Sequence, residues 1–103
     1  MKHKVLCVDD TPENLEFLIG LLQPIYDVMV VPSGAHALAA LEHVRPDVIL
    51  LDVMMPEMDG YEVCQRLKAD LTTKHIPIIF LTGKTQPEDE AKALRMGAND
   101  YIS

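Results

Sequence analysis

The chain alternates short, fully apolar runs with longer segments whose apolar positions recur every three or four residues. The apolar runs occupy residues 5–8, 28–31, 48–51 and 76–81, and a fifth strand is predicted to begin at residue 99. Runs that are apolar at every position are typical of strands covered on both faces, as in a parallel sheet. The resulting order, β-α-β-α-β-α-β-α-β with helices of about ten residues, predicts an α/β fold with right-handed crossovers.

Four helical segments lie between the predicted strands. The first begins at Thr11, interpreted as a hydroxyl N-cap, has Pro12 at its first position and ends before Pro24. The fourth begins with a capping-box-like sequence at residues 85–88 and ends at Gly97. The positions predicted to face the core are Leu15, Leu18, Ile19 and Leu22, then Ala37, Leu38, Leu41 and Val44, then Val63, Cys64, Leu67 and Leu71, and finally Ala91 and Leu94.

Composition narrows the class of protein. A chain of 103 residues predicts one domain over residues 1–103, and a net charge of −7 argues against nonspecific binding of nucleic acid or of an anionic membrane by this segment. No stretch approaches the ~20 apolar residues of a membrane span, and the first residues do not form a signal peptide, so a cytoplasmic location is expected. Cys7 and Cys64 fall within apolar patterns and are predicted to be buried free thiols.

Three acidic residues and one hydroxyl stand where predicted strands end. Asp9 and Asp10 follow the first strand, Asp52 the third and Thr82 the fourth. In a parallel sheet these ends share one edge, so neighbouring strands would bring the side chains together. Oxygen ligands without His or Cys favour Mg²⁺ or Mn²⁺. A carboxylate beside such an ion can accept a phosphoryl group and become an aspartyl-phosphate.

Four motifs together resemble the receiver domain of two-component response regulators. They are Asp9-Asp10, the sequence DVMMPEMDG at residues 52–60, residues 81–83 and residues 97–101, and the resemblance covers essentially the whole chain. It implies a flavodoxin-like (CheY-like), doubly wound parallel sheet of five strands in the order 2-1-3-4-5. It also implies a phosphorelay switch whose partners are a sensor histidine kinase or a phosphotransfer protein and, in a longer parent protein, a downstream output domain.

The resemblance assigns a role to each motif residue. Asp52 matches the phosphoacceptor, and Asp9 and Asp10 match the acidic pair that positions Mg²⁺. The backbone carbonyl of Met54 matches a further ligand of the ion. Thr82 and Tyr101 match the switch pair, in which the hydroxyl and the aromatic ring move on phosphorylation and reshape the surface formed by the fourth helix and fifth strand. From the residues alone, a threonine such as Thr82 is more often a strand-end hydroxyl, and Tyr101 could be a half-buried edge-strand aromatic residue.

The chain departs from the family pattern at its C-terminal end. The family continues with Lys-Pro and a fifth helix, whereas this sequence stops at Ser103. We therefore expect apolar faces of the first and fifth strands to lie open. A second copy of the chain, an exchanged element or downstream sequence would cover them. We also expect Mg²⁺ binding to persist and phosphorylation to be impaired.

The predicted switch is not an enzyme acting on an independent substrate. The sequence is also compatible with two other functions. One is a degenerate receiver-like interaction or dimerisation module that binds metal but is poorly phosphorylated. The other is a Mg²⁺-dependent phosphatase using Asp52 as its nucleophile. Such enzymes commonly carry a second Asp two residues later, where this chain has Met54, and a specificity cap domain does not fit within its length.

Overall fold

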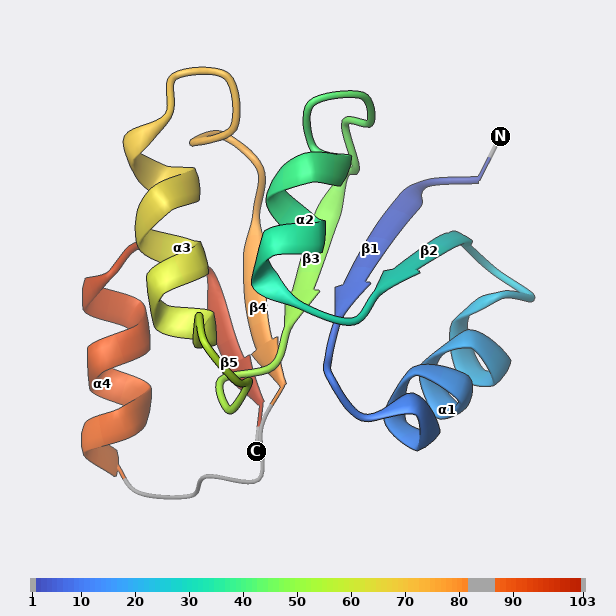
Figure 1. Ribbon diagram of the computed structural model, residues 1–103, viewed down its shortest axis with the longest axis horizontal. Helices are drawn as coiled ribbons and strands as arrows, with labels where there is room; N and C mark the ends of the chain where they lie inside the picture. Colours follow the sequence, from blue (N-terminus) through green and yellow to red (C-terminus); the bar gives the residue numbers. More distant parts are fainter. Residues whose placement is uncertain (1, 82–86, 103) are drawn as a thin grey trace.

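The strands of the protein form one parallel sheet with helices on both faces (Figure 1). The computed structural model describes residues 2–81 and 87–102. The strands run in the order β2-β1-β3-β4-β5, which confirms the predicted 2-1-3-4-5 arrangement. Their bounds are β1 (Lys4–Val8), β2 (Asp27–Val31), β3 (Val48–Leu51), β4 (Ile78–Leu81) and β5 (Asp100–Ile102).

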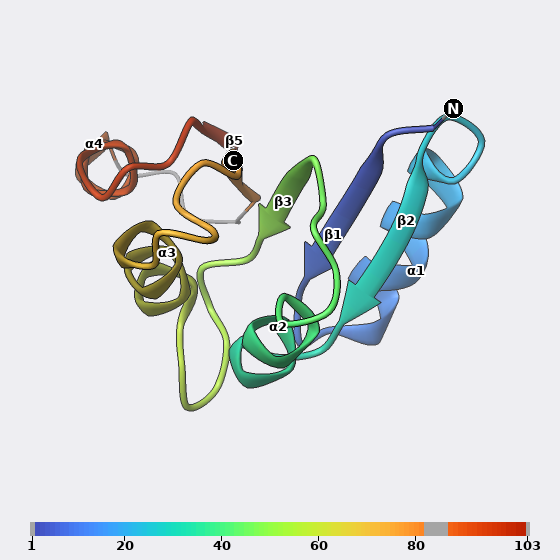
Figure 2. The same cartoon turned by 90° about the horizontal axis from the view of Figure 1, so that it is seen from above.

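The helices divide unequally between the two faces of the sheet. Within the described residues they are α1 (Pro12–Leu22), α2 (Gly34–Ala40), α3 (Gly60–Ala69) and α4 (Pro87–Arg95). Figure 2 shows α1 on one face and the other three helices on the opposite face. The core lies between the sheet and these three helices, where inward side chains of neighbouring strands, such as Leu6 and Ile49, are fully buried. None of the α1 side chains is fully buried.

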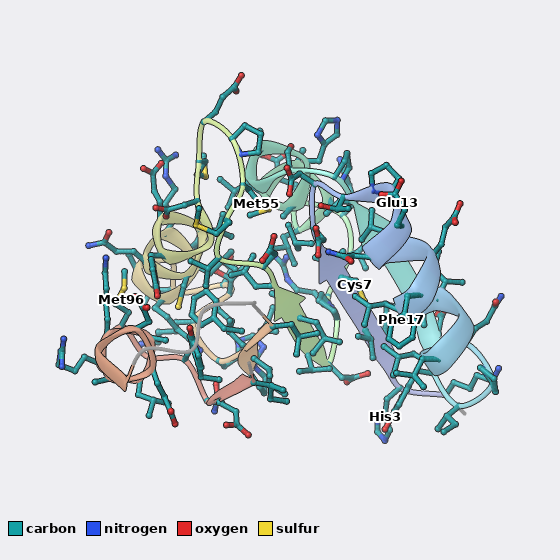
Figure 3. All side chains as sticks on the ribbon, turned by 90° about the horizontal axis from the view of Figure 1, so that it is seen from below. His3, Cys7, Glu13, Phe17, Met55 and Met96 are labelled. Atoms are coloured by element: carbon teal, nitrogen blue, oxygen red, sulfur yellow. The ribbon has the colours of Figure 1, made fainter. Side chains whose placement is uncertain are left out.

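α1 covers only part of the sheet face on which it lies. Cys7 of β1 lies on the side toward α1, whereas Met55 and Met96 lie among the helices of the other face (Figure 3). Val5 and Cys7 are buried, so the prediction that β1 would lie open is wrong, because α1 packs on this strand. The prediction holds for β5, where 51% of Ile102 is exposed.

Two of the predicted core positions are exposed instead. α3 ends at Ala69, and the turn that follows, in which Asp70 accepts hydrogen bonds from the backbone N–H and hydroxyl of Thr72, leaves Leu71 77% exposed. In α4 the fully buried residue is Ala93, so Leu94, one step of about 100° further round the helix, is 46% exposed.

The chain reversals partly match their predictions. Gly97 follows α4 with φ of 99°, the left-handed conformation expected of a C-terminal glycine. The capping-box sequence at residues 85–88 falls mainly outside the described residues.

In the described part of the chain, every helix is too short or too polar to span a bilayer.

Candidate functional site

Three carboxylates converge at the ends of β1 and β3. These strands pair in parallel with Val8 opposite Leu51, so Asp9, Asp10 and Asp52 leave the sheet side by side, and the backbone N–H of Asp52 donates to the carbonyl of Val8 at 2.9 Å. One carboxylate oxygen from each acid lies within 4.8 Å of the others. Asp9 is buried, Asp52 is partly buried and Asp10 is exposed. The predicted meeting of these side chains is confirmed.

Burial and the neighbouring charges both raise the pKa of Asp52. Burial, followed by the negative charge of Asp9, raises the pKa of Asp52 from 3.8 to about 6, with a smaller contribution from Asp10. Hydrogen bonds from the backbone N–H groups of Met54 and Val53 to the Asp52 carboxylate lower its pKa and offset part of this rise. A divalent cation would relieve the repulsion, and a set of carboxylate oxygens fits a hard ion such as Mg²⁺.

The loop after Asp52 folds back so that Gly60 lies against the backbone of Asp52 and Val53. The backbone N–H of Gly60 donates to the carbonyl of Val53 at 2.9 Å, and a Cβ atom at Gly60 would lie 2.2 Å from the carbonyl oxygen of Asp52. Glu57 adopts φ of 67° within this loop. Asp59 caps α3 by accepting a hydrogen bond from the backbone N–H of Glu62 at 2.9 Å. The Gly60 position therefore fixes the path of the loop beside Asp52.

Asp9 is held by the start of α1. Its Oδ1 accepts the backbone N–H of Thr11 at 2.9 Å, and its Oδ2 accepts the side-chain amide of Asn14 at 3.1 Å. Thr11 occupies the N-cap position, but its side chain makes no capping hydrogen bond, so the predicted hydroxyl cap is wrong. Sequence reasoning missed Asn14; the available signal was an amide three residues after the N-cap, directly downstream of the acidic pair.

Aromatic side chains form a row between the sheet and the helices. Tyr101 is buried on β5 with its ring centroid 6.4 Å from that of Phe80, and Phe80 lies 5.4 Å from Tyr61 at the start of α3. Lys92 of α4 places its Nζ 4.3 Å from the Tyr61 ring centroid. The row links the α4–β5 face to the loop that follows Asp52. Thr82, the other predicted switch residue, lies outside the described residues.

Comparison with known proteins places this arrangement in a family. The family described as the response regulator receiver domain matches residues 5–103. A probable cyclic di-GMP phosphodiesterase of Vibrio cholerae is 46% identical over 95% of this chain, and the response regulator PleD of Caulobacter vibrioides is 41% identical over all of it. The chemotaxis protein CheY4 of Vibrio cholerae superposes with a TM-score of 0.92 at 34% identity, covering 99% of this chain and 86% of that one.

The chain spans only part of the curated relatives. It covers 22% of the phosphodiesterase and 23% of PleD. The shared region is therefore the receiver part of longer proteins. Receiver domains are generally signalling modules without an enzymatic activity of their own, bind Mg²⁺ through acidic residues, and interact with histidine kinases or phosphotransfer proteins and with output domains. With its fold, its acidic cluster and its matched sequence in agreement, the chain belongs to the response regulator receiver domain family.

Proposed function

We propose that this chain is a phosphorylation-dependent signalling switch in which Asp52 accepts the phosphoryl group. The observation that carries the proposal is the meeting of three carboxylate oxygens within 4.8 Å at adjacent strand ends. Asp9, Asp10 and Asp52, with the backbone carbonyl of Met54, would hold Mg²⁺, or Mn²⁺ in its place. When bound, this ion neutralises charge on the incoming phosphoryl group and orients it.

The residues around Asp52 supply what the transfer needs. A pKa of about 6 leaves the Asp52 carboxylate largely ionised at neutral pH, and two backbone N–H groups hold its orientation. One carboxylate oxygen attacks phosphorus while the bond from phosphorus to the donor nitrogen of a phosphohistidine breaks. The imidazole leaves with the electron pair, and Asp52 becomes an acyl phosphate. The donor is a sensor histidine kinase or a phosphotransfer protein, in the cytoplasm.

Phosphorylation is read out at the α4–β5 face. We assign Thr82 and Tyr101 as the switch pair, supported by the burial of Tyr101 against Phe80 at the end of the aromatic row. A change at Asp52 reaches this row through the loop that leads into Tyr61. The partner at this face is an output domain or a separate protein, since the curated relatives extend well beyond the receiver part.

Incubation with acetyl phosphate, with and without Mg²⁺, tests the proposal directly. Intact mass spectrometry should show one added phosphoryl group that requires Mg²⁺ and is lost in Asp52→Asn. Glu57→Gln, an acid-to-amide change at an exposed position of the same loop, should retain the modification. Metal binding without modification would instead support the degenerate interaction module, and turnover of a phosphoester would support the phosphatase.

A further inference from the structure

Each carboxylate oxygen of Asp9 accepts a hydrogen bond from a residue at the start of α1. Thr11 contributes a backbone N–H at 2.9 Å, and Asn14 contributes its side-chain amide at 3.1 Å. A carboxylate at a strand end is otherwise free to rotate about its side-chain bonds. Two donors on different oxygens fix both its direction and the orientation of its plane.

Asn14 is itself held by a well-formed helical turn. The backbone N–H groups of Asn14 and Leu15 both donate to the carbonyl of Thr11, at 3.1 and 3.2 Å, and Pro12 begins the helix with its restricted backbone. The amide of Asn14 therefore reaches Asp9 from a backbone that is already ordered. The orientation of Asp9 depends on where α1 begins.

The chemistry of the Asn14 side chain suits this position. A lysine or arginine reaching Asp9 would place a positive charge in the acidic cluster and compete with a cation. A neutral amide donates to one lone pair of Oδ2 and leaves the negative charge of the carboxylate, and a further lone pair on each oxygen, available. The Asn14 amide can therefore orient Asp9 without taking the place of a bound cation.

We propose that Asn14 is a positioning residue of the metal site, which holds Asp9 in the orientation that the bound divalent cation requires. This inference rests on the proposed function only in its choice of the acidic cluster as the metal site. It adds that the start of α1 and the cation site form one unit. Disturbing the first turn of α1 should therefore weaken ion binding.

Isothermal titration calorimetry with Mg²⁺ alone tests this inference without any phosphodonor. Asn14→Leu keeps the branched shape of the side chain and removes the donor, and it should weaken Mg²⁺ binding about tenfold, as expected for loss of an outer-shell partner. Asn14→Gln keeps an amide donor and should recover part of the affinity. Gln23→Leu makes the same kind of change at the other end of α1 and should leave Mg²⁺ affinity unaltered.

Thermal unfolding in the presence of EDTA separates positioning from general stability. Asn14→Leu and Gln23→Leu should have similar melting temperatures, so that the difference in affinity is confined to the metal site. Mg²⁺ affinity within twofold of the unaltered chain in Asn14→Leu, or no Mg²⁺ binding by the unaltered chain, would overturn the inference. A chain that binds Mg²⁺ but is not modified by acetyl phosphate would overturn the proposed function alone.

Discussion

Asp52 combines partial burial with two negative neighbours, and the balance of these effects can be measured through stability. Its pKa is raised from 3.8 to about 6 in the folded chain. The folded state therefore favours the protonated form, and this contribution to stability is lost as pH rises from about 4 through 6. In the absence of metal, ionised Asp52 destabilises the fold at neutral pH.

The Asp52→Asn variant should remove this penalty. In buffers containing EDTA, we expect its melting temperature to exceed that of the unaltered chain at pH 7 to 8 and to approach it near pH 4. Calorimetric or circular-dichroism melts over this range measure the effect, with Glu57→Gln as the acid-to-amide control. An advantage for Asp52→Asn that is constant with pH would show that the gain comes from packing rather than charge.

The two thiols provide a second test at the scale of single residues. Burial, with the charge of Asp9 adding to it, raises the pKa of Cys7 to about 11, and burial raises the pKa of Cys64. Both are free and buried, as predicted from the sequence. Because the thiolate is the reactive form, Ellman's reagent at pH 8 should titrate neither thiol in the folded chain and both in denaturant. Rapid reaction of one thiol under native conditions would contradict the burial of that residue.

At the scale of elements, the connection from β3 to α3 depends on a single glycine. A Cβ atom at Gly60 would lie 2.2 Å from the carbonyl oxygen of Asp52, and only backbone movement could relieve that contact. Gly60→Ala should therefore lower the free energy of unfolding by more than about 2 kcal/mol and slow modification by acetyl phosphate. Urea denaturation measures the first effect.

Gly20 is the matched control for this change. It lies within α1, and a Cβ atom added there would meet no heavy atom within 4 Å beyond its own helix backbone and chain neighbours. Gly20→Ala should therefore raise the free energy of unfolding by about 0.5–1 kcal/mol through the better helix propensity of alanine. Equal effects of the two substitutions would show that the close approach at Gly60 is not the limiting contact.

The elements also show which features a sequence can predict. The apolar runs determine which segments are strands, and the parallel topology then brings Asp9, Asp10 and Asp52 to one edge, so the acidic cluster could be predicted. The exposure of Leu71 and Leu94 could not, because it depends on where α3 ends and on which side of α4 meets the sheet. The hydrogen bond from Asn14 to Asp9 could not be predicted either, because it depends on the angle at which α1 leaves β1.

At the scale of the whole molecule, the sheet is covered unevenly. Leu50 and Ile79 are only partly buried on the α1 face, and Phe17 and Leu21 of α1 and Ile102 of β5 are exposed. Neighbouring exposed apolar side chains favour association in water. We expect the 103-residue chain on its own to self-associate through this face as a homodimer, with or without exchange of elements.

Sedimentation velocity over a range of concentrations measures this association. Ile102→Lys places a charge on the open face and should shift the equilibrium toward the monomer, together with weaker binding of the dye ANS. Leu71→Lys, at an exposed leucine beyond α3, should change neither measurement. A monomer at all concentrations with no dye binding would show that the open face does not drive association.

The aromatic row has a practical consequence for following the protein in solution. The chain contains three tyrosines and no tryptophan, so near-ultraviolet absorption and emission come mainly from tyrosine. Two of the three, Tyr61 and Tyr101, flank Phe80 between the acidic site and the α4–β5 face, while Tyr26 lies beyond α1. The native chain thus carries an intrinsic optical reporter at its proposed route of communication, and Tyr26→Phe would make that signal specific without any attached label.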